Sequence, residues 1–215
     1  MGGHGDGPCA VGGEPSLTLL MRRGTRSKWH RPAPEGQPRS FRTQQYAPPA
    51  ALPHETIVVH TAGDGDARRK DSPPPPAGYG FVAVLNGAPM YTVAGPIVVG
   101  VWPSIRTTTE NLGALVAFTQ ACEWAAVDPR AMGKPVVIRY SNEYGAAIAT
   151  GTWRARKHKA MASSAQAAWR RLRKASGGNA WILHEPDMAW WAMVARNLAA
   201  RGKSGERIRT VEGLE

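Results

Sequence analysis

Apolar runs of strand length and segments with helical spacing start near residue 55 and continue to about residue 203. Five stretches in this region are rich in β-branched and aromatic residues and have the length of strands. Two of them flank Asn86-Gly87, a dipeptide that favours the tight turn of a β-hairpin. The predicted strands span residues 56–61, 79–85, 90–95, 135–140 and 180–184.

Four other segments have helical spacing or helix-ending signals. The first follows a Thr-Thr-Thr-Glu cap at 107–110, and its apolar residues recur as in an amphipathic helix. Gly177-Gly178 ends the third helix and Gly202 ends the fourth. The predicted helices span residues 110–127, 143–150, 161–175 and 190–201.

The element order is therefore β-β-β-α-β-α-α-β-α. It predicts an α/β fold with a mixed five-stranded sheet flanked by helices. Residues 1–53 lack periodicity and are rich in Gly, Pro, Ser and Arg, so we expect an irregular basic N-terminal tail. The folded domain is predicted at 54–203 and a C-terminal tail at 204–215. The first tail fits an organelle transit peptide and a nucleic-acid-touching segment equally well.

The composition and net charge predict the chemical class of the binding partner. The net charge is +11 and the pI about 10.3, which favours a polyanion, with nucleic acid ahead of an anionic membrane surface. No run of 18 apolar residues is present, so no membrane span is expected. The two cysteines, Cys9 and Cys122, have no metal-ligand spacing, which fits an intracellular, reducing compartment. Nucleus, cytoplasm and organelle stay open.

A basic stretch narrows the expected contact surface. Residues 154–174 hold eight Lys or Arg and no acid. The ordinary explanation is a solvated helix face. However, like charges one helical turn apart, such as Arg170 and Lys174, cost stability unless a partner neutralises them. We expect phosphate contacts without base reading. The predicted nucleic-acid-binding residues are Trp153, Arg154, Arg156, Lys157, Lys159, Arg170, Arg171, Arg173 and Lys174.

Three segments carry a family resemblance. Residues 138–154 contain Ser141-Asn142-Glu143-Tyr144 at the end of a predicted strand, residues 76–81 read Pro-Ala-Gly-Tyr-Gly-Phe, and residues 198–202 read Leu-Ala-Ala-Arg-Gly. In this order and spacing they resemble the ribonuclease H family over about residues 55–203. The resemblance implies a ribonuclease H-like fold and, in the family, four carboxylates around two magnesium ions at the scissile phosphate.

The four family positions hold other residues here. The family pattern Thr-Asp-Gly reads Thr61-Ala62-Gly63, and Ser141 stands where the fourth strand of the family ends in Asp. The first-helix Glu matches Asn111, although a gap of one residue would bring Glu110 there. The last-helix Asp matches Arg196, and a guanidinium repels Mg²⁺. The family's mobile histidine position reads Glu185-Pro186. The resemblance therefore implies a pseudoenzyme without catalytic residues, metal or other cofactor.

The chain contains eight tryptophans, and the sequence predicts which of them are buried. Trp181, Trp190 and Trp191 are expected to pack in the core near the closing strand and helix, and base stacking is an alternative for Trp153.

Three hypotheses follow from the sequence. The first is a binding module that holds RNA or an RNA–DNA hybrid, in isolation or within a ribonucleoprotein assembly. The second is an active RNA–DNA hybrid endoribonuclease that uses Mg²⁺ or Mn²⁺ at a displaced site. The third is a protein-interaction subunit whose basic face meets an acidic partner. The substitute carboxylates of the second hypothesis are Asp64, Asp66, Glu110 and Glu143.

Overall fold

A computed structural model describes residues 43–66, 75–100, 105, 108–186 and 188–211 of the chain. All of these belong to one compact unit that starts at Ser40. Most of the predicted N-terminal tail, residues 1–42, lies outside the described residues. Among the described residues, no helix combines the length and the apolar character that crossing a bilayer requires.

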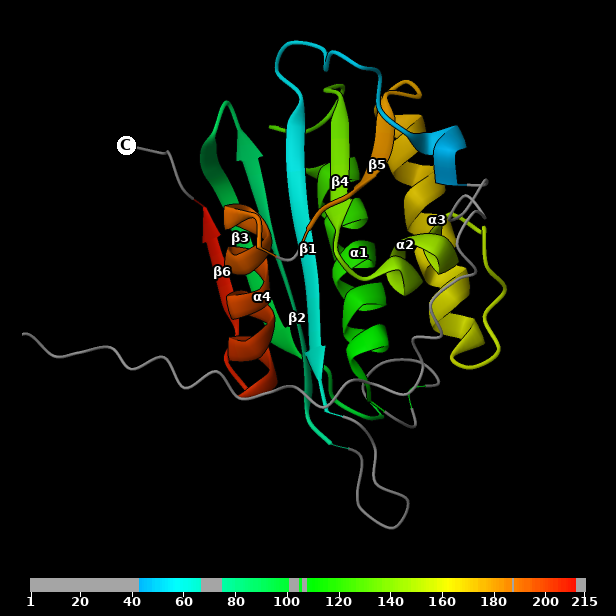
Figure 1. Cartoon of the computed structure of the whole chain (residues 1–215), viewed down its shortest axis with the longest axis vertical. Coiled ribbons are helices and arrows are strands. Elements are labelled where there is room, and N and C mark those ends of the chain that lie inside the picture. The colour runs from blue at the N-terminus through cyan, green and yellow to red at the C-terminus, as the bar shows by residue number, and fades with distance from the viewer. Residues whose placement is uncertain (1–42, 67–74, 101–104, 106–107, 187, 212–215) are drawn as a thin grey trace, which may run out of the picture. The chain divides into compact units, whose positions relative to one another are not determined.

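A mixed sheet of six strands organises the described residues (Figure 1). β1 lies inside the sheet, antiparallel to β2 and parallel to β4, so the hairpin strands and the crossover strands meet on either side of it. The strand order is β5-β4-β1-β2-β3-β6. The strands are β1 (Ile57–Gly65), β2 (Ala77–Leu85), β3 (Ala88–Pro96), β4 (Val136–Tyr140), β5 (Ala180–His184) and β6 (Ile208–Val211).

Helices cover the sheet through two separate cores. The larger core joins one sheet face to α1, α2 and α3, and the smaller joins the opposite face to α4. α1 was expected to be amphipathic, but this is wrong: almost every side chain from Leu112 to Ala126 is buried, because the sheet covers one side of the helix and α3 packs on another. The helices are α1 (Glu110–Val127), α2 (Glu143–Ala149), α3 (Lys159–Ala175) and α4 (Trp190–Lys203).

The elements predicted from the sequence are confirmed, with shifted ends. Asn86 and Gly87 have φ angles of 52° and 82°, as the tight hairpin turn requires. Thr109 caps α1 by accepting a hydrogen bond from the Leu112 amide at 3.2 Å. β1 extends to Gly65, beyond the predicted end at residue 61. α3 starts at Lys159, two residues earlier than expected.

The predicted count of five strands is one too low. β6 lies within the segment 204–215 that was expected to be a tail, and it pairs antiparallel with β3, Thr210 lying opposite Thr92. Its side chains are exposed except for the half-buried Ile208. β6 is held at the sheet edge by backbone pairing with β3, by a hydrogen bond from Arg209 Nε to the Tyr91 hydroxyl and by the half-buried Ile208. Such a short strand has no apolar periodicity for sequence reasoning to detect.

A short 3-10 helix, η1 (Thr43–Tyr46), precedes the sheet. It falls within the segment 1–53 that was expected to be irregular. The Tyr46 ring packs edge-on against Trp169 at a centroid distance of 5.4 Å, and the Arg173 guanidinium lies 5.3 Å from its centroid. These contacts fix the end of the predicted tail to α3.

Close backbone contacts through glycine join the layers. A Cβ atom on Gly63 of β1 would lie 2.0 Å from the Ala114 nitrogen of α1. A Cβ atom on Gly80 of β2 would lie 2.6 Å from the Ala199 nitrogen of α4. Real Cβ atoms do not approach backbone this closely, so only glycine permits the observed helix-to-sheet distance.

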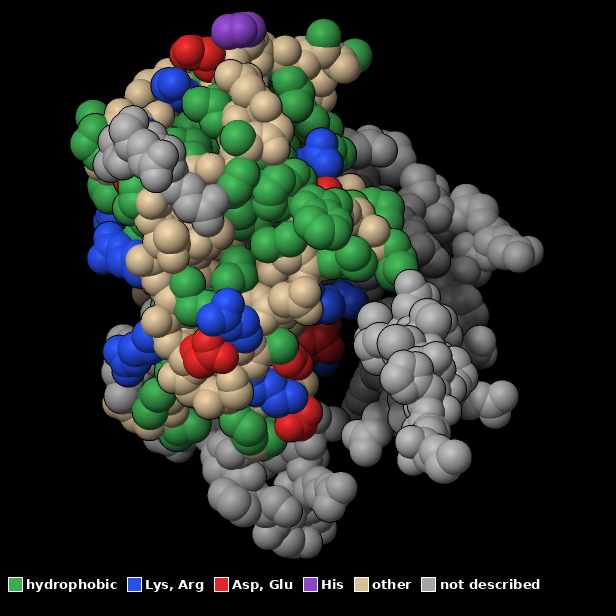
Figure 2. All heavy atoms as spheres, turned by 90° about the vertical axis from the view of Figure 1, so that its left-hand side faces the viewer, with side chains coloured by type: hydrophobic (Ala, Val, Ile, Leu, Met, Phe, Trp, Pro, Cys, Tyr) green, Lys and Arg blue, Asp and Glu red, His purple; other side chains and the backbone are tan. Residues whose placement is uncertain are grey.

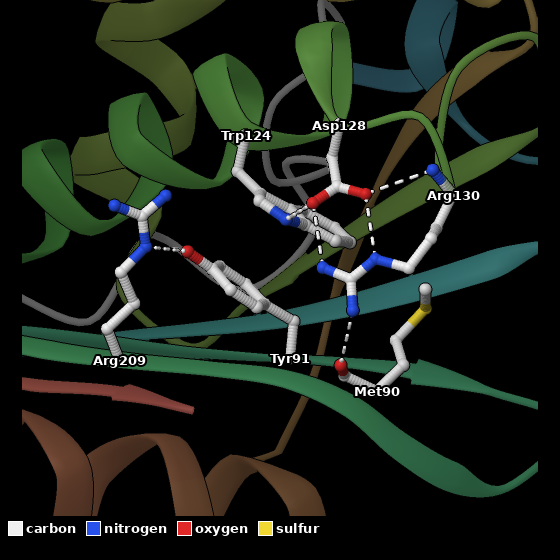
Figure 3. A network of polar contacts seen from close by, with 6 residues as sticks. All are labelled: Met90, Tyr91, Trp124, Asp128, Arg130 and Arg209. Carbon is white, nitrogen blue, oxygen red and sulfur yellow. Dashed lines mark hydrogen bonds and ion pairs between the residues drawn. The ribbon is translucent and has the colours of Figure 1, made fainter. Parts of the chain in front are cut away.

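A polar network ties the end of α1 to β3 (Figure 3). The Asp128 carboxylate accepts hydrogen bonds from the Trp124 indole at 2.8 Å and from Arg130 Nε and Nη2 at 2.8 and 2.7 Å. Arg130 Nη1 also donates to the Met90 carbonyl of β3 at 3.2 Å. The Tyr91 ring stacks on Trp124 at 5.1 Å, so aromatic packing and hydrogen bonds hold the same junction.

Replacement of Asp128 by Asn should lower the free energy of unfolding by about 2 kcal/mol at neutral pH, as hydrogen bonds to a charged group are lost. The Arg130 hydrogen bond lowers the pKa of Asp128 from 3.8 to about 2. Because the folded-state pKa is the lower one, the ionised group stabilises the domain above 3.8, and this contribution disappears as pH falls through 2. Urea denaturation across that range should give a flatter profile for Asp128→Asn. Glu123→Gln, on the same helix, should retain the wild-type profile.

Candidate functional site

The first family position lies in a packed environment. Ala62 of β1 pairs with Gly80 of β2 and is 4% exposed, in the small core that contains Ala195 and Ala199 of α4. Arg196 follows Ala195 and its side chain is exposed. The last helix therefore crosses β1 beside Ala62, and its Arg196 lies one residue beyond the contact.

The family positions at the start of α1 and just after β4 both lie close to Asn142. Ser141 directly follows β4, and Asn142 caps α2 by accepting from the Tyr144 amide at 3.0 Å. The Asn142 amide donates to Asn111 Oδ1 at 2.9 Å and reaches Glu110 Oε1 at 3.4 Å. The start of α1 is thus held against the carboxyl end of β4. Both Glu110 and Asn111 contact the same Asn142 amide, so both alternatives for the family position stay open.

Asp64 and Asp66, near the end of the first strand, both face a lysine. Asp64 lies in β1 itself, because this strand is longer than predicted, and Asp66 follows it. Lys203 Nζ, at the end of α4, lies 2.7 Å from Asp66 Oδ1 and 3.6 Å from Asp64 Oδ1. The hydrogen bond to Asp66 is the main cause of a raised pKa of Lys203. Figure 2 views the side of α4 and β6, where acidic and basic side chains are intermixed.

Glu143 opens α2 and is partly exposed. Taken over the described ranges, no three His, Cys, Asp or Glu side chains gather where they would hold a metal ion. The four substitute carboxylates therefore lie on β1 and the loop after it, at the start of α1 and at the start of α2, without a common cluster.

A buried ionic cluster lies across three strands, and sequence reasoning missed it. Glu185 directly follows β5, and its Oε2 lies 2.5 Å from His60 Nδ1 of β1. Its Oε1 accepts from Arg139 Nη1 of β4 at 3.0 Å. Burial would raise the pKa of Glu185, but the hydrogen bonds and charges of His60 and Arg139 lower it. His60 and Arg139 are register partners in β1 and β4. The only sequence signal was a polar residue inside each of two apolar strands.

The basic stretch divides into two groups. The loop before α3 carries the first group, with exposed Arg154 and Lys157, and Trp153 is 42% exposed. The Trp153 amide donates to the Ala147 carbonyl at 3.0 Å, which fixes the loop to α2. The exposed residues of the first group are Trp153, Arg154, Arg156, Lys157 and Lys159.

The second group lies near the end of α3. At about 1.5 Å per residue, Arg170 lies about 16 Å along the helix axis from Lys159 of the first group. Arg170 and Lys174 are exposed, whereas Arg173 is half-buried against Tyr46. Arg171 lines a groove of about 950 Å³ on the β3 and β6 side, together with Arg207 and Arg209. The nine predicted residues therefore do not form one compact patch.

The tryptophan predictions are only partly correct. Trp190, expected in the core, is 67% exposed at the start of α4, whereas Trp181 and Trp191 are partly buried. Trp169 is the tryptophan of α3 that packs in the core, against Phe118 at a centroid distance of 5.9 Å.

Comparisons with known proteins support the fold through structure alone. No protein-family model and no curated protein matches the sequence. LC11-RNase H1, isolated from compost by a metagenomic approach, superposes with a TM-score of 0.52 and 18% identity, over 70% of this chain and 96% of its own. The N-terminal RNase H domain of a Mycobacterium tuberculosis protein gives 0.51 and 16%, over 70% and 94%.

The RNase H domain of the virus PFV gives a TM-score of 0.50 and 16% identity, over 71% of this chain and 96% of that domain. Each of these three domains is matched over nearly its whole length, so the likeness includes the sheet and the helices together. The chain therefore has the α/β ribonuclease H-like fold that the sequence resemblance implied.

Proposed function

We propose that this ribonuclease H-like domain is a pseudoenzyme that binds RNA or an RNA–DNA hybrid through backbone phosphates, without a metal or other cofactor. The partner is held alone or as part of a ribonucleoprotein assembly inside the cell. The observation that carries the proposal is the exposed, acid-free basic loop that leads into α3.

The electrostatics of this loop support phosphate contact. Arg154, Arg156 and Lys157 are exposed, and no ion pair joins them to any carboxylate of the described residues. Unpaired surface cations gain free energy when they neutralise phosphates, because counterions are released from the nucleic acid. The exposed Trp153 ring beside them offers a face on which an unpaired base can stack.

The residues at the four family positions do not fit a pair of magnesium ions. Mg²⁺ requires oxygen ligands, mainly carboxylates, at fixed distances. The Ala62 methyl group packs against α4, and the two nearby aspartates are bound by the Lys203 ammonium. The Lys203 ammonium beside Asp64 and Asp66 opposes the binding of a metal cation there. These contacts support a domain that binds its partner without cleaving it.

Active cleavage is the second candidate function, and one observation favours it. The Asn142 amide reaches Glu110 Oε1 at 3.4 Å, so a carboxylate lies near the carboxyl end of β4, which supports a displaced site. Incubation with an RNA–DNA hybrid and Mg²⁺ or Mn²⁺ tests this function. Cleavage that disappears in Glu110→Gln, Asp64→Asn or Glu143→Gln would replace the pseudoenzyme proposal.

Binding itself is tested by fluorescence anisotropy with a labelled RNA–DNA hybrid at increasing salt. The variant Arg154→Gln/Arg156→Gln/Lys157→Gln should lose about tenfold or more in affinity, and the salt slope should fall by about 1 for each phosphate contact removed. The control Lys134→Gln/Arg201→Gln/Arg207→Gln removes the same charge from the turn before β4, from α4 and from the segment before β6. It should bind within about twofold of wild type.

Equal losses in the two variants would show that net charge alone attracts the hybrid. Absence of binding at low salt would instead favour the protein-interaction hypothesis, with an acidic partner.

A further inference from the structure

A pocket smaller than the groove at β3 and β6 is lined by Arg170 and Arg173 of the second basic group. None of the four family positions lines it. It has a volume of about 330 Å³ and lies among η1, the end of α2 and the second half of α3. We call it the Tyr46 pocket. The lining residues that matter here are Tyr46, Thr150, Gln166, Trp169, Arg170 and Arg173.

Hydrogen-bond donors dominate this lining. Arg170 and Arg173 bring two guanidinium groups, and Trp169 brings an indole N–H. No carboxylate of the described residues lines the pocket. A concave site whose described lining carries two guanidinium groups and no carboxylate favours an anion over a neutral or cationic ligand.

The acceptors at the end of α2 are already used. The Ala146 carbonyl accepts from the Thr150 amide and hydroxyl, both at 2.9 Å. The Ile148 carbonyl accepts from the Gly151 amide at 3.1 Å and from the Gln166 side chain at 3.2 Å. The protein therefore satisfies its own carbonyls here, and the surplus consists of donors.

Two of these donors are buried and have no partner among the described residues. Within that part of the chain, Trp169 Nε1 and Arg173 Nε lack a hydrogen-bond acceptor, and both side chains line the pocket. Trp169 is 3% exposed. Leaving a buried donor unpaired is unfavourable, so such groups in native proteins usually have a ligand, an ion or a water as partner.

Contacts within the domain set the positions of the Trp169 and Arg173 side chains before any ligand binds. Tyr46 packs edge-on against Trp169 and lies under the Arg173 guanidinium, and Arg173 also reaches the Gly178 carbonyl at 3.5 Å. Preorganised donors lose little conformational entropy on binding, which favours a compact anion with several acceptor oxygens.

We infer that the Tyr46 pocket binds a phosphate group through Arg170, Arg173 and the Trp169 indole. If the phosphate is part of a bound RNA or hybrid, the inference rests on the proposed function. The same chemistry would accept free phosphate or a nucleotide, and the experiment separates these sources.

The test follows the indole N–H resonance of Trp169 in the ¹⁵N-labelled full chain, assigned with Trp169→Phe. Inorganic phosphate is titrated against sodium chloride of equal ionic strength. Phosphate should shift the Trp169 signal saturably, and chloride should not. Arg170→Gln should weaken phosphate binding about tenfold. Arg201→Gln removes one charge from α4, outside the pocket lining, so it should bind phosphate as wild type does.

Arg173→Gln serves as a second variant, with its folding checked by thermal unfolding. A Trp169 signal unmoved by phosphate, or moved equally by chloride, would overturn the inference. So would equal weakening in Arg170→Gln and Arg201→Gln.

Oligonucleotides with and without a 5′-phosphate identify the source. A shift of the Trp169 signal by both assigns a backbone phosphate, and a shift by the phosphorylated strand alone assigns a strand end. A shift by inorganic phosphate or a mononucleotide alone assigns a free ligand. A full chain that does not bind the hybrid, but whose Trp169 signal still shifts with phosphate, would contradict the proposed function and leave the phosphate site intact.

Discussion

Gly63→Val is expected to unfold the domain or to destabilise it by about 4 kcal/mol or more, because steric overlap with backbone cannot be relieved by a side-chain rotation. A Cβ atom at Gly63 would lie 2.0 Å from the Ala114 nitrogen and 2.3 Å from the Gly113 carbonyl carbon. β1 and α1 would have to separate, and the largest core lies between them. Far-UV circular dichroism and urea denaturation measure the change.

Gly87→Ala is the control for backbone strain alone. Gly87 has a φ of 82° and nothing within 4 Å of an added Cβ, so a side chain there adds backbone strain without overlap. Its cost should be about 1–2 kcal/mol. If Gly63→Val were as stable as Gly87→Ala, the close contact between β1 and α1 would be contradicted.

Glu185→Ala should cost about 3 kcal/mol, because it leaves His60 and part of Arg139 buried without their shared anion. His60 is 3% exposed and Glu185 5%, so water cannot readily replace the lost contacts. Arg139 is partly exposed, which limits the loss. Urea denaturation at neutral pH measures it.

The pH dependence gives a second readout. The pKa of Glu185 is lowered in the folded domain, so its ionised form stabilises the fold above the ordinary carboxyl pKa. This stabilisation is lost as pH falls through the lowered value. Glu185→Ala should therefore flatten the stability profile in that acid range. Glu206→Ala removes an exposed carboxylate from its pair with Arg201 and should change little. Similar profiles for both variants would contradict a stabilising role for the buried cluster.

Local signals explain what sequence reasoning predicted well. The hairpin at Asn86-Gly87, the cap at Thr109 and the glycines after α3 are short-range features, and each depends only on neighbouring residues. The apolar runs of β1 and β4 also suffice to place buried strands at the centre of a sheet.

Features that depend on pairing between distant segments were missed. Glu185 meets His60 and Arg139 only because β1, β4 and β5 align in a particular register, which no local pattern specifies. The Tyr46 contact with Trp169 likewise joins residues far apart in the chain. β6 was missed for the opposite reason, since its contribution is backbone pairing with little apolar burial.

The position of β6 at the sheet edge has a consequence for folding order. Its partner β3 is synthesised early, whereas every helix from α1 to α4 precedes β6 along the chain. Closing such a long loop is entropically costly and slow, so β6 is expected to join after the rest of the sheet has formed. Until then β3 presents an open edge with unpaired backbone groups, where a nascent chain is most exposed to intermolecular strand pairing. Docking of β6 pairs the β3 edge, and the outer edge of the sheet then passes to β6, a strand of only 4 residues, which offers a shorter template for intermolecular pairing.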